Sequence, residues 1–151
     1  NWFLKTYFHY QNEDSPDLSL LALYANTTLN ESARQHRISI TTAQELKKQA
    51  FSAYETLIDR DKDTLRLANY GQTLVVQDQY NLARRAYAKI ENSDRYDAGL
   101  RQSHLTACLK SDCSDDKLKK ILSGLHTSKN WKSSLSLLRD ANRTDLALSY
   151  F

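Results

Sequence analysis

Residues with metal-ligating side chains gather in one stretch of the sequence. His104 and Cys108 are four residues apart, so a helix would place them on one face, and Asp112 and Cys113 follow shortly after. Imidazole, thiolate and carboxylate groups are the ligands that zinc takes in proteins. The leucines beside them instead indicate an ordinary packed helix, in which cysteine serves as a small buried residue. We therefore expect no metal site, and the sequence leaves the redox state of Cys108 and Cys113 open.

The common catalytic motifs are absent from the sequence. It contains no Gly-rich phosphate loop, no G-x-S-x-G nucleophile elbow, and no H-E-x-x-H or C-x-x-C pair. Carboxylates come in short runs at 13–14, 59–63 and 115–116, mostly near expected helix starts or in loops, where they favour the helix dipole and solubility. We expect no catalytic residue and no cofactor, and the protein is predicted not to be an enzyme.

Lysines are concentrated in the second half of the chain, although the net charge is only +3. Those at 110, 117, 119, 120, 129 and 132 could form a patch for an acidic peptide, nucleic acid or lipid headgroups. Acidic Asp112, Asp115 and Asp116 interleave with them, and most of these lysines have no aromatic neighbour for base stacking. We interpret them as a solvated helix face and do not expect nucleic acid as a partner.

The composition predicts an all-α protein. The 151 residues include Gly 3 and Pro 1, far below the roughly 7% and 5% of average proteins. We expect one domain over residues 1–151. No apolar run approaches the roughly 18 residues that span a bilayer, and Ser19 interrupts the longest candidate, at 18–25, so no membrane span is expected. Because the chain starts at Asn1 and contains no Met, we expect a piece of a larger protein. The sequence does not predict a compartment.

The spacing of apolar residues, mostly three and four apart, places the helices between short polar breaks. Ser15 before Pro16 is a candidate cap for the first of them. Thr41 or Thr42, followed by Glu45, resembles a capping box that opens a long helix. The expected helices cover 16–29, 42–59, 63–76, 79–91, 94–110, 115–125, 129–141 and 144–151.

One helix pair in the centre carries a repeat signature. Its residues are Leu67, Tyr70, Gly71, Leu74, Ala83 and Tyr87. Their spacing resembles a tetratricopeptide repeat (TPR) over roughly residues 64–97. Gly71 and Ala83 fall where two antiparallel helices cross, so their small size lets the axes approach. The resemblance implies an α-α superhelix, a right-handed solenoid of antiparallel helix pairs.

Further copies of the signature are weaker. One begins at Trp131, 64 positions after Leu67, and ends with Ala147 and Phe151, while the pair between them is degenerate. Upstream, the first helix is followed by two possible registers for the second helix. One places the small and aromatic positions at Arg34 and Ile38, and the other at Ala50 and Tyr54; the long Arg34 side chain favours the second register without settling the choice.

The TPR resemblance implies a function in protein–protein interaction. Family members hold a peptide or helix of a partner in a concave groove lined by the first helices of successive pairs. The groove positions expected to bind the partner fall on Asn69, Gln72, Val76, Gln102 and Thr106. Asn69 matches a position at which some members hold a peptide backbone or a terminal carboxylate. The cation of the chaperone-tail clamp falls on Gly99 or Ser103, so that ligand is not expected.

An aromatic cluster at the N-terminus supports an alternative. It consists of Trp2, Phe3, Tyr7, Phe8 and Tyr10. These side chains would lie on more than one face of a helix, so the segment is expected to need a partner, and self-association through it is one outcome. The alternative function is a structural helical segment of a larger coat, secretion or envelope assembly, with no peptide groove of its own.

Overall fold

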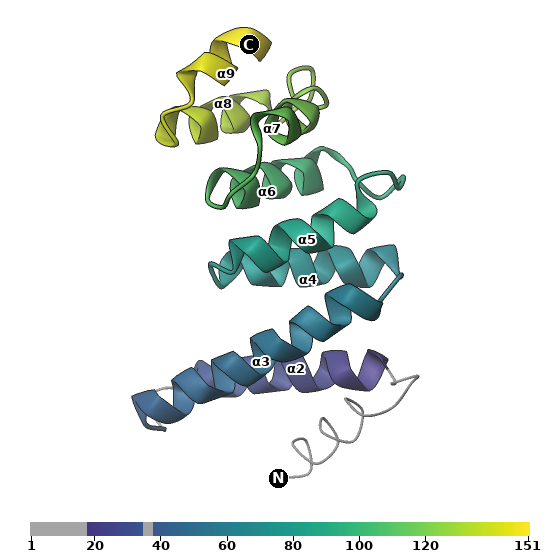
Figure 1. Cartoon of the computed structure of the whole chain (residues 1–151), viewed down its shortest axis with the longest axis vertical. Coiled ribbons are helices and arrows are strands. Elements are labelled where there is room, and N and C mark those ends of the chain that lie inside the picture. Colours follow the sequence, from purple (N-terminus) through teal and green to yellow (C-terminus); the bar gives the residue numbers. More distant parts are fainter. Residues whose placement is uncertain (1–17, 35–37) are drawn as a thin grey trace. The chain divides into compact units, whose positions relative to one another are not determined.

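The computed structural model describes residues 18–34 and 38–151, and all regular elements there are helices (Figure 1). The all-α expectation is confirmed over this part of the chain. None of its helices is long and apolar enough to cross a bilayer. The helices are α2 (Leu18–Ser32), α3 (Ile40–Arg60), α4 (Thr64–Val76), α5 (Tyr80–Ile90), α6 (Ala98–Leu109), α7 (Asp115–Leu122), α8 (Trp131–Asp140) and α9 (Thr144–Tyr150).

Most predicted helix ends agree with the structure to within two residues, but α2 ends at Ser32 instead of 29, α7 ends at Leu122 instead of 125, and α6 starts later than predicted. The N-cap of α3 is Ser39, whose side chain accepts a hydrogen bond from the Thr42 amide at 3.1 Å. The capping box predicted at Thr41 or Thr42 is therefore wrong, because both residues already lie inside the helix. Helix α6 begins at Ala98, since the Asp97 side chain accepts from the Leu100 amide at 2.9 Å. The Ser15 cap lies outside the described residues.

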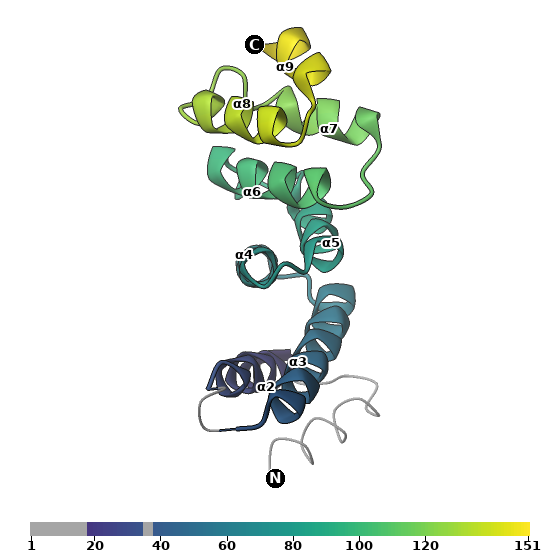
Figure 2. The ribbon, with the colours of Figure 1, turned by 90° about the vertical axis from the view of Figure 1, so that its left-hand side faces the viewer.

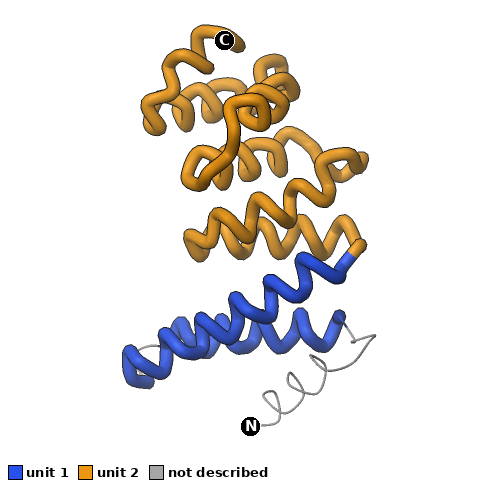
Figure 3. The backbone as a smooth tube through the Cα atoms, viewed as in Figure 1, with its two compact units in different colours: residues 1–61 blue, residues 62–151 orange. Residues whose placement is uncertain are grey.

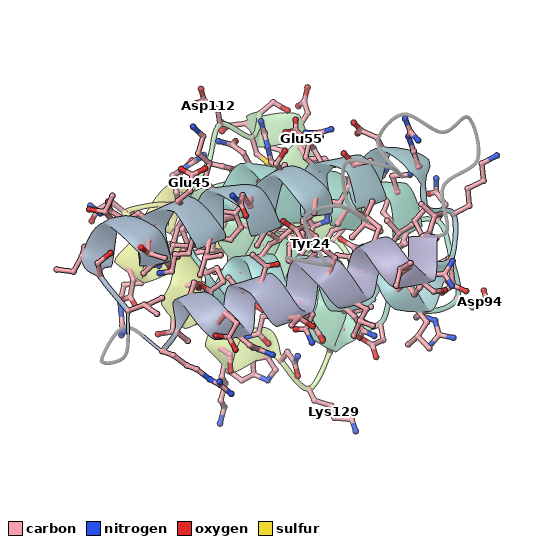
Figure 4. The ribbon with its side chains drawn as sticks, turned by 90° about the horizontal axis from the view of Figure 1, so that it is seen from below. Tyr24, Glu45, Glu55, Asp94, Asp112 and Lys129 are labelled. Atoms are coloured by element: carbon pink, nitrogen blue, oxygen red, sulfur yellow. A yellow bond between two sulfur atoms is a disulfide. The ribbon has the colours of Figure 1, made fainter. Side chains whose placement is uncertain are left out.

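The chain divides into two compact units, residues 1–61 and residues 62–151 (Figure 3). In the first, α2 and α3 form an antiparallel hairpin whose helices pack along their length. Ala25 on α2 and Ala50 on α3 are fully buried, and Tyr24 lies between the two helices (Figure 4). Tyr54 is also buried on α3, whereas Arg34 and Ile38 belong to the segment that connects α2 to α3. The hairpin thus places Ala50 and Tyr54 on its second helix.

In the second unit, the repeat signature forms the interior of the α4–α5 hairpin. All six signature residues are buried. A Cβ atom added to Gly71 would lie 2.8 Å from two ring atoms of Tyr87, which is fully buried. The side chain of Tyr87 on α5 therefore fills the space that glycine leaves on α4. This is the small-against-large packing that the spacing predicts.

The helices of the second unit form two layers. Helix α6 packs against both α4 and α8. Figure 2 shows α4, α6 and α8 on one side of this unit and α5 and α7 on the other. Leucines and isoleucine of α6 to α9 make a continuous core that includes Leu105, Leu118, Ile121, Leu122, Leu138 and Leu146. Trp131, the first signature residue of the last pair, is the first residue of α8 and is 40% exposed. The unit is a stack of helix pairs.

Candidate functional site

The five predicted partner-binding residues lie on two helices that pack against each other. Asn69 and Gln72 are exposed on α4, and Val76, its last residue, is 77% exposed. Their spacing puts them on one stripe of the helix. Gln102 and Thr106 are half-buried one turn apart on α6. The Thr106 hydroxyl donates to the Gln102 carbonyl at 3.3 Å.

A hollow of about 290 Å³ lies beside Thr106, between α6 and α8. Leu109 and Leu137 give it an apolar lining. Lys110 and Asp140, also in the lining, were not predicted from the sequence. They lie one 34-residue TPR repeat after Val76 and Thr106, so the repeat length could have identified them. The complete lining is Thr106, Leu109, Lys110, Leu137, Asp140 and Ala141.

The rim of this hollow carries one charge of each sign. The Lys110 ammonium lies 5.3 Å from the centre of the Tyr80 ring and 3.4 Å from its hydroxyl oxygen. The Asp140 carboxylate pairs with the Arg139 guanidinium at 3.3 Å, where both side chains are exposed. The hollow can therefore take an apolar side chain whose flanking groups are polar.

A second cavity, of about 480 Å³, opens between α5 and the start of α7. Its lining includes three cationic side chains and one carboxylate. Cys113, also in the lining, forms a disulfide with Cys108 of α6, so neither is a free thiol. The described residues contain no cluster of three or more potential metal ligands. The lining residues are Arg84, Arg85, Ala88, His104, Asp112, Cys113, Ser114 and Lys117.

His104 is the buried titratable group of this region. It is fully buried, and its Nδ1 atom lies 2.6 Å from the Tyr96 hydroxyl. Its Nε2 atom is buried and has no hydrogen-bond partner among the described residues. Burial first, and the Lys117 charge second, lower the pKa of His104 to about 4. The sequence marked His104 only as a weak metal candidate, and no local signal predicts an unpartnered nitrogen.

Tyr87 extends the buried aromatic cluster around His104. The centres of the two rings are 5.5 Å apart. Burial raises the pKa of Tyr87 to about 12, and the nearby Ser103 side chain opposes that shift. The Tyr87 hydroxyl makes no hydrogen bond of good geometry within the described residues. This cluster joins α5 to α6.

Several of the lysines expected on a solvated face have specific partners. Glu91 accepts from Lys117 at 2.5 Å and from Lys120 at 3.2 Å. Burial raises the pKa of Glu91, but the hydrogen bonds from these two lysines outweigh it, so the net shift is downward. Lys132 lies over the Trp131 ring. Five of the six lysines are exposed, as expected for a solvated face, and Lys117 is half-buried.

Arg143 links the last two helix pairs at the surface. Its guanidinium contacts the Asp115 carboxylate at 3.0 Å and the Asp145 carboxylate at 2.8 Å. The hydrogen bond from Arg143 lowers the pKa of Asp145 to about 2.

His126 is exposed near Tyr150, with 6.5 Å between ring centres. His9, His36 and the N-terminal aromatic cluster lie outside the described residues.

Reduction of the disulfide is expected to destabilise the protein by about 2 kcal/mol, because the bond closes a short loop between the end of α6 and the turn before α7. The measurement is urea unfolding followed by circular dichroism, with and without dithiothreitol. Cys113→Ser is the control, since reductant should not change its stability. An equal effect of reductant on both proteins, or no effect on the wild type, would contradict a disulfide at this position.

Comparison with known proteins finds no matching family model, no matching curated protein and no matching solved structure.

Proposed function

We propose that this protein is a TPR-like scaffold that holds a peptide or helix of a partner protein against the α4, α6 and α8 layer of its second unit. The observation that carries this proposal is the hollow between α6 and α8, with its apolar lining from Leu109 and Leu137, directly beside the predicted Thr106. A layer of successive first helices is the surface that TPR proteins use for binding.

Two further observations support a TPR-like architecture. Helix α6 packs on both α4 and α8, as the first helices of successive repeats would. Gly71 and Tyr87 meet at the crossing of α4 and α5, in the roles that the TPR signature gives them. The function proposed is therefore binding rather than catalysis.

The chemistry of the surface suggests how a partner would be held. An apolar partner side chain would enter the hollow over Leu109 and Leu137. Asn69, Gln72 and Gln102 offer amide groups, which supply a donor and an acceptor together and so can pair with a peptide backbone. Lys110 and Asp140 would set the orientation of charged groups on either side of the anchor.

Selection from a random peptide library tests the proposal. The wild-type chain should enrich peptides with an apolar anchor. Their affinity should fall roughly tenfold or more in the double variant Asn69→Glu, Gln72→Glu, because two new charges stand on the binding stripe. A matched control is Asn81→Glu, Asn92→Glu, which adds the same charge at two exposed positions in or just after α5. Fluorescence anisotropy measures the dissociation constants, and circular dichroism confirms the fold of each variant.

Equal affinity in all three proteins would refute the α4 stripe as the binding surface, and failure to select any peptide would refute the scaffold function.

The alternative, a structural helical segment of a larger assembly, is favoured by one observation. Leu148 is 86% exposed and Phe151 is 40% exposed at the end of α9. Self-association that rises with concentration, and that the Asn69→Glu, Gln72→Glu variant leaves unchanged, would support that alternative.

A further inference from the structure

Among the polar side chains that line the second cavity, hydrogen-bond donors from three helices predominate. Arg84 comes from α5, His104 from α6 and Lys117 from α7, and Arg85 adds a further cation to the lining. Asp112 is the single carboxylate of the lining, and Glu91 lies next to it as the partner of Lys117. An excess of cations with donors on several sides favours a ligand that only accepts hydrogen bonds.

Arg84 is fixed in position while part of its guanidinium stays available. Its Nη1 group donates to the Asp112 carbonyl at 2.9 Å and lies 3.5 Å from Cys113 Sγ. These contacts tie α5 to the loop before α7. The Nε and Nη2 groups make no hydrogen bond to the described residues. A held guanidinium with free N–H groups is suited to an oxyanion.

His104, one of the lining residues, has an unpartnered ring nitrogen. A neutral imidazole carries one N–H, and the hydrogen bond of the other nitrogen decides where it is. Burial raises the pKa of Tyr96, so its hydroxyl stays protonated, and in one tautomer of His104 it donates to Nδ1. The proton of His104 is then on Nε2, which is buried, lacks a partner and belongs to the residue that lines the cavity. An acceptor atom in the cavity would satisfy it.

We propose that this cavity binds a phosphate group, held by Arg84, Lys117 and the Nε2–H of His104. Donors that come from three helices around one space match the oxygens of a tetrahedral anion better than those of a planar carboxylate. The volume of about 480 Å³ exceeds the size of a phosphate ion, so it leaves room for the organic part of a phosphate monoester. The site is distinct from the hollow between α6 and α8.

A titration followed by NMR of the histidine side-chain nitrogens tests this site in the intact chain. The probes are inorganic phosphate and phenyl phosphate, with acetate and chloride as comparators, all at constant pH and ionic strength. We expect both phosphates to shift the His104 Nε2 resonance to saturation, with acetate and chloride giving no saturable shift. Tighter binding of phenyl phosphate than of inorganic phosphate would identify the ligand as a monoester, and the reverse would identify free phosphate.

Variants separate the site from general charge effects. Arg84→Gln is expected to weaken phosphate binding at least about tenfold. Arg139→Gln, which removes the same charge from an exposed position on α8, should leave it unchanged. If Arg84→Gln does not fold by circular dichroism, Lys117→Gln replaces it with the same expectation. Saturable shifts with acetate or chloride, an unmoved His104 resonance, or wild-type affinity in a folded Arg84 or Lys117 variant would overturn the proposal.

Discussion

Replacing Gly71 by alanine is expected to destabilise the protein by roughly 1–3 kcal/mol, although alanine is the better helix former. The added methyl group would lie 2.8 Å from two ring atoms of Tyr87. That ring is fully buried between α4 and α5 and next to His104, so it has little room to move. The loss from the steric clash therefore exceeds the gain of about 1 kcal/mol in helix propensity.

The same substitution should change sign when the ring is removed. In a Tyr87→Leu background, Gly71→Ala is expected to stabilise the protein by up to about 1 kcal/mol, because only the helix propensity then remains. Urea unfolding of the four proteins of this double-mutant cycle gives the coupling between the two positions. An equal loss of stability in both backgrounds would show that the Tyr87 ring does not set the size limit at Gly71.

Acidification is expected to destabilise the protein through His104. Its pKa in the folded state is about 4, whereas an unfolded histidine titrates near 6.5. Between these values the unfolded chain binds the proton more readily, so stability is intact above about pH 6.5 and is lost as the pH falls toward 4. The gap corresponds to roughly 3 kcal/mol. The charged groups that act on His104 are Lys117, Glu91, Arg101 and Arg84.

The slope of stability against pH identifies the residue responsible. His104→Phe should lose most of the decline between pH 6.5 and 4, whatever its stability at pH 7. His126→Gln, which removes an exposed histidine, is the control variant. The lowered pKa of Glu91 and that of Asp145 act mainly below about pH 4.5, where unfolded carboxylates protonate. A wild-type slope in His104→Phe would show that His104 is not the group that titrates.

The sequence by itself determined where the helices lie and which faces are buried. The 3.6-residue period marks one apolar stripe per helix, and short polar breaks mark the ends, so the order from α2 to α9 could be predicted from local information. The TPR resemblance predicts that Gly71 and Tyr87 belong to one helical hairpin, and the two residues meet there. Prediction was weaker at the start of α3, where Ser39 caps instead of the nearby threonines.

The tertiary structure decided which side chains meet between helices that do not belong to the same hairpin. The bond between Cys108 and Cys113 depends on the path of the chain after α6 ends. The hollow beside Thr106 depends on how closely α8 follows α6. The position of Tyr96 gives Nδ1 of His104 a partner, whereas Nε2 has none among the described residues. Periodicity specifies the apolar face of each helix, but neighbours across a packed interface are fixed only when side chains of definite shape fill the same volume.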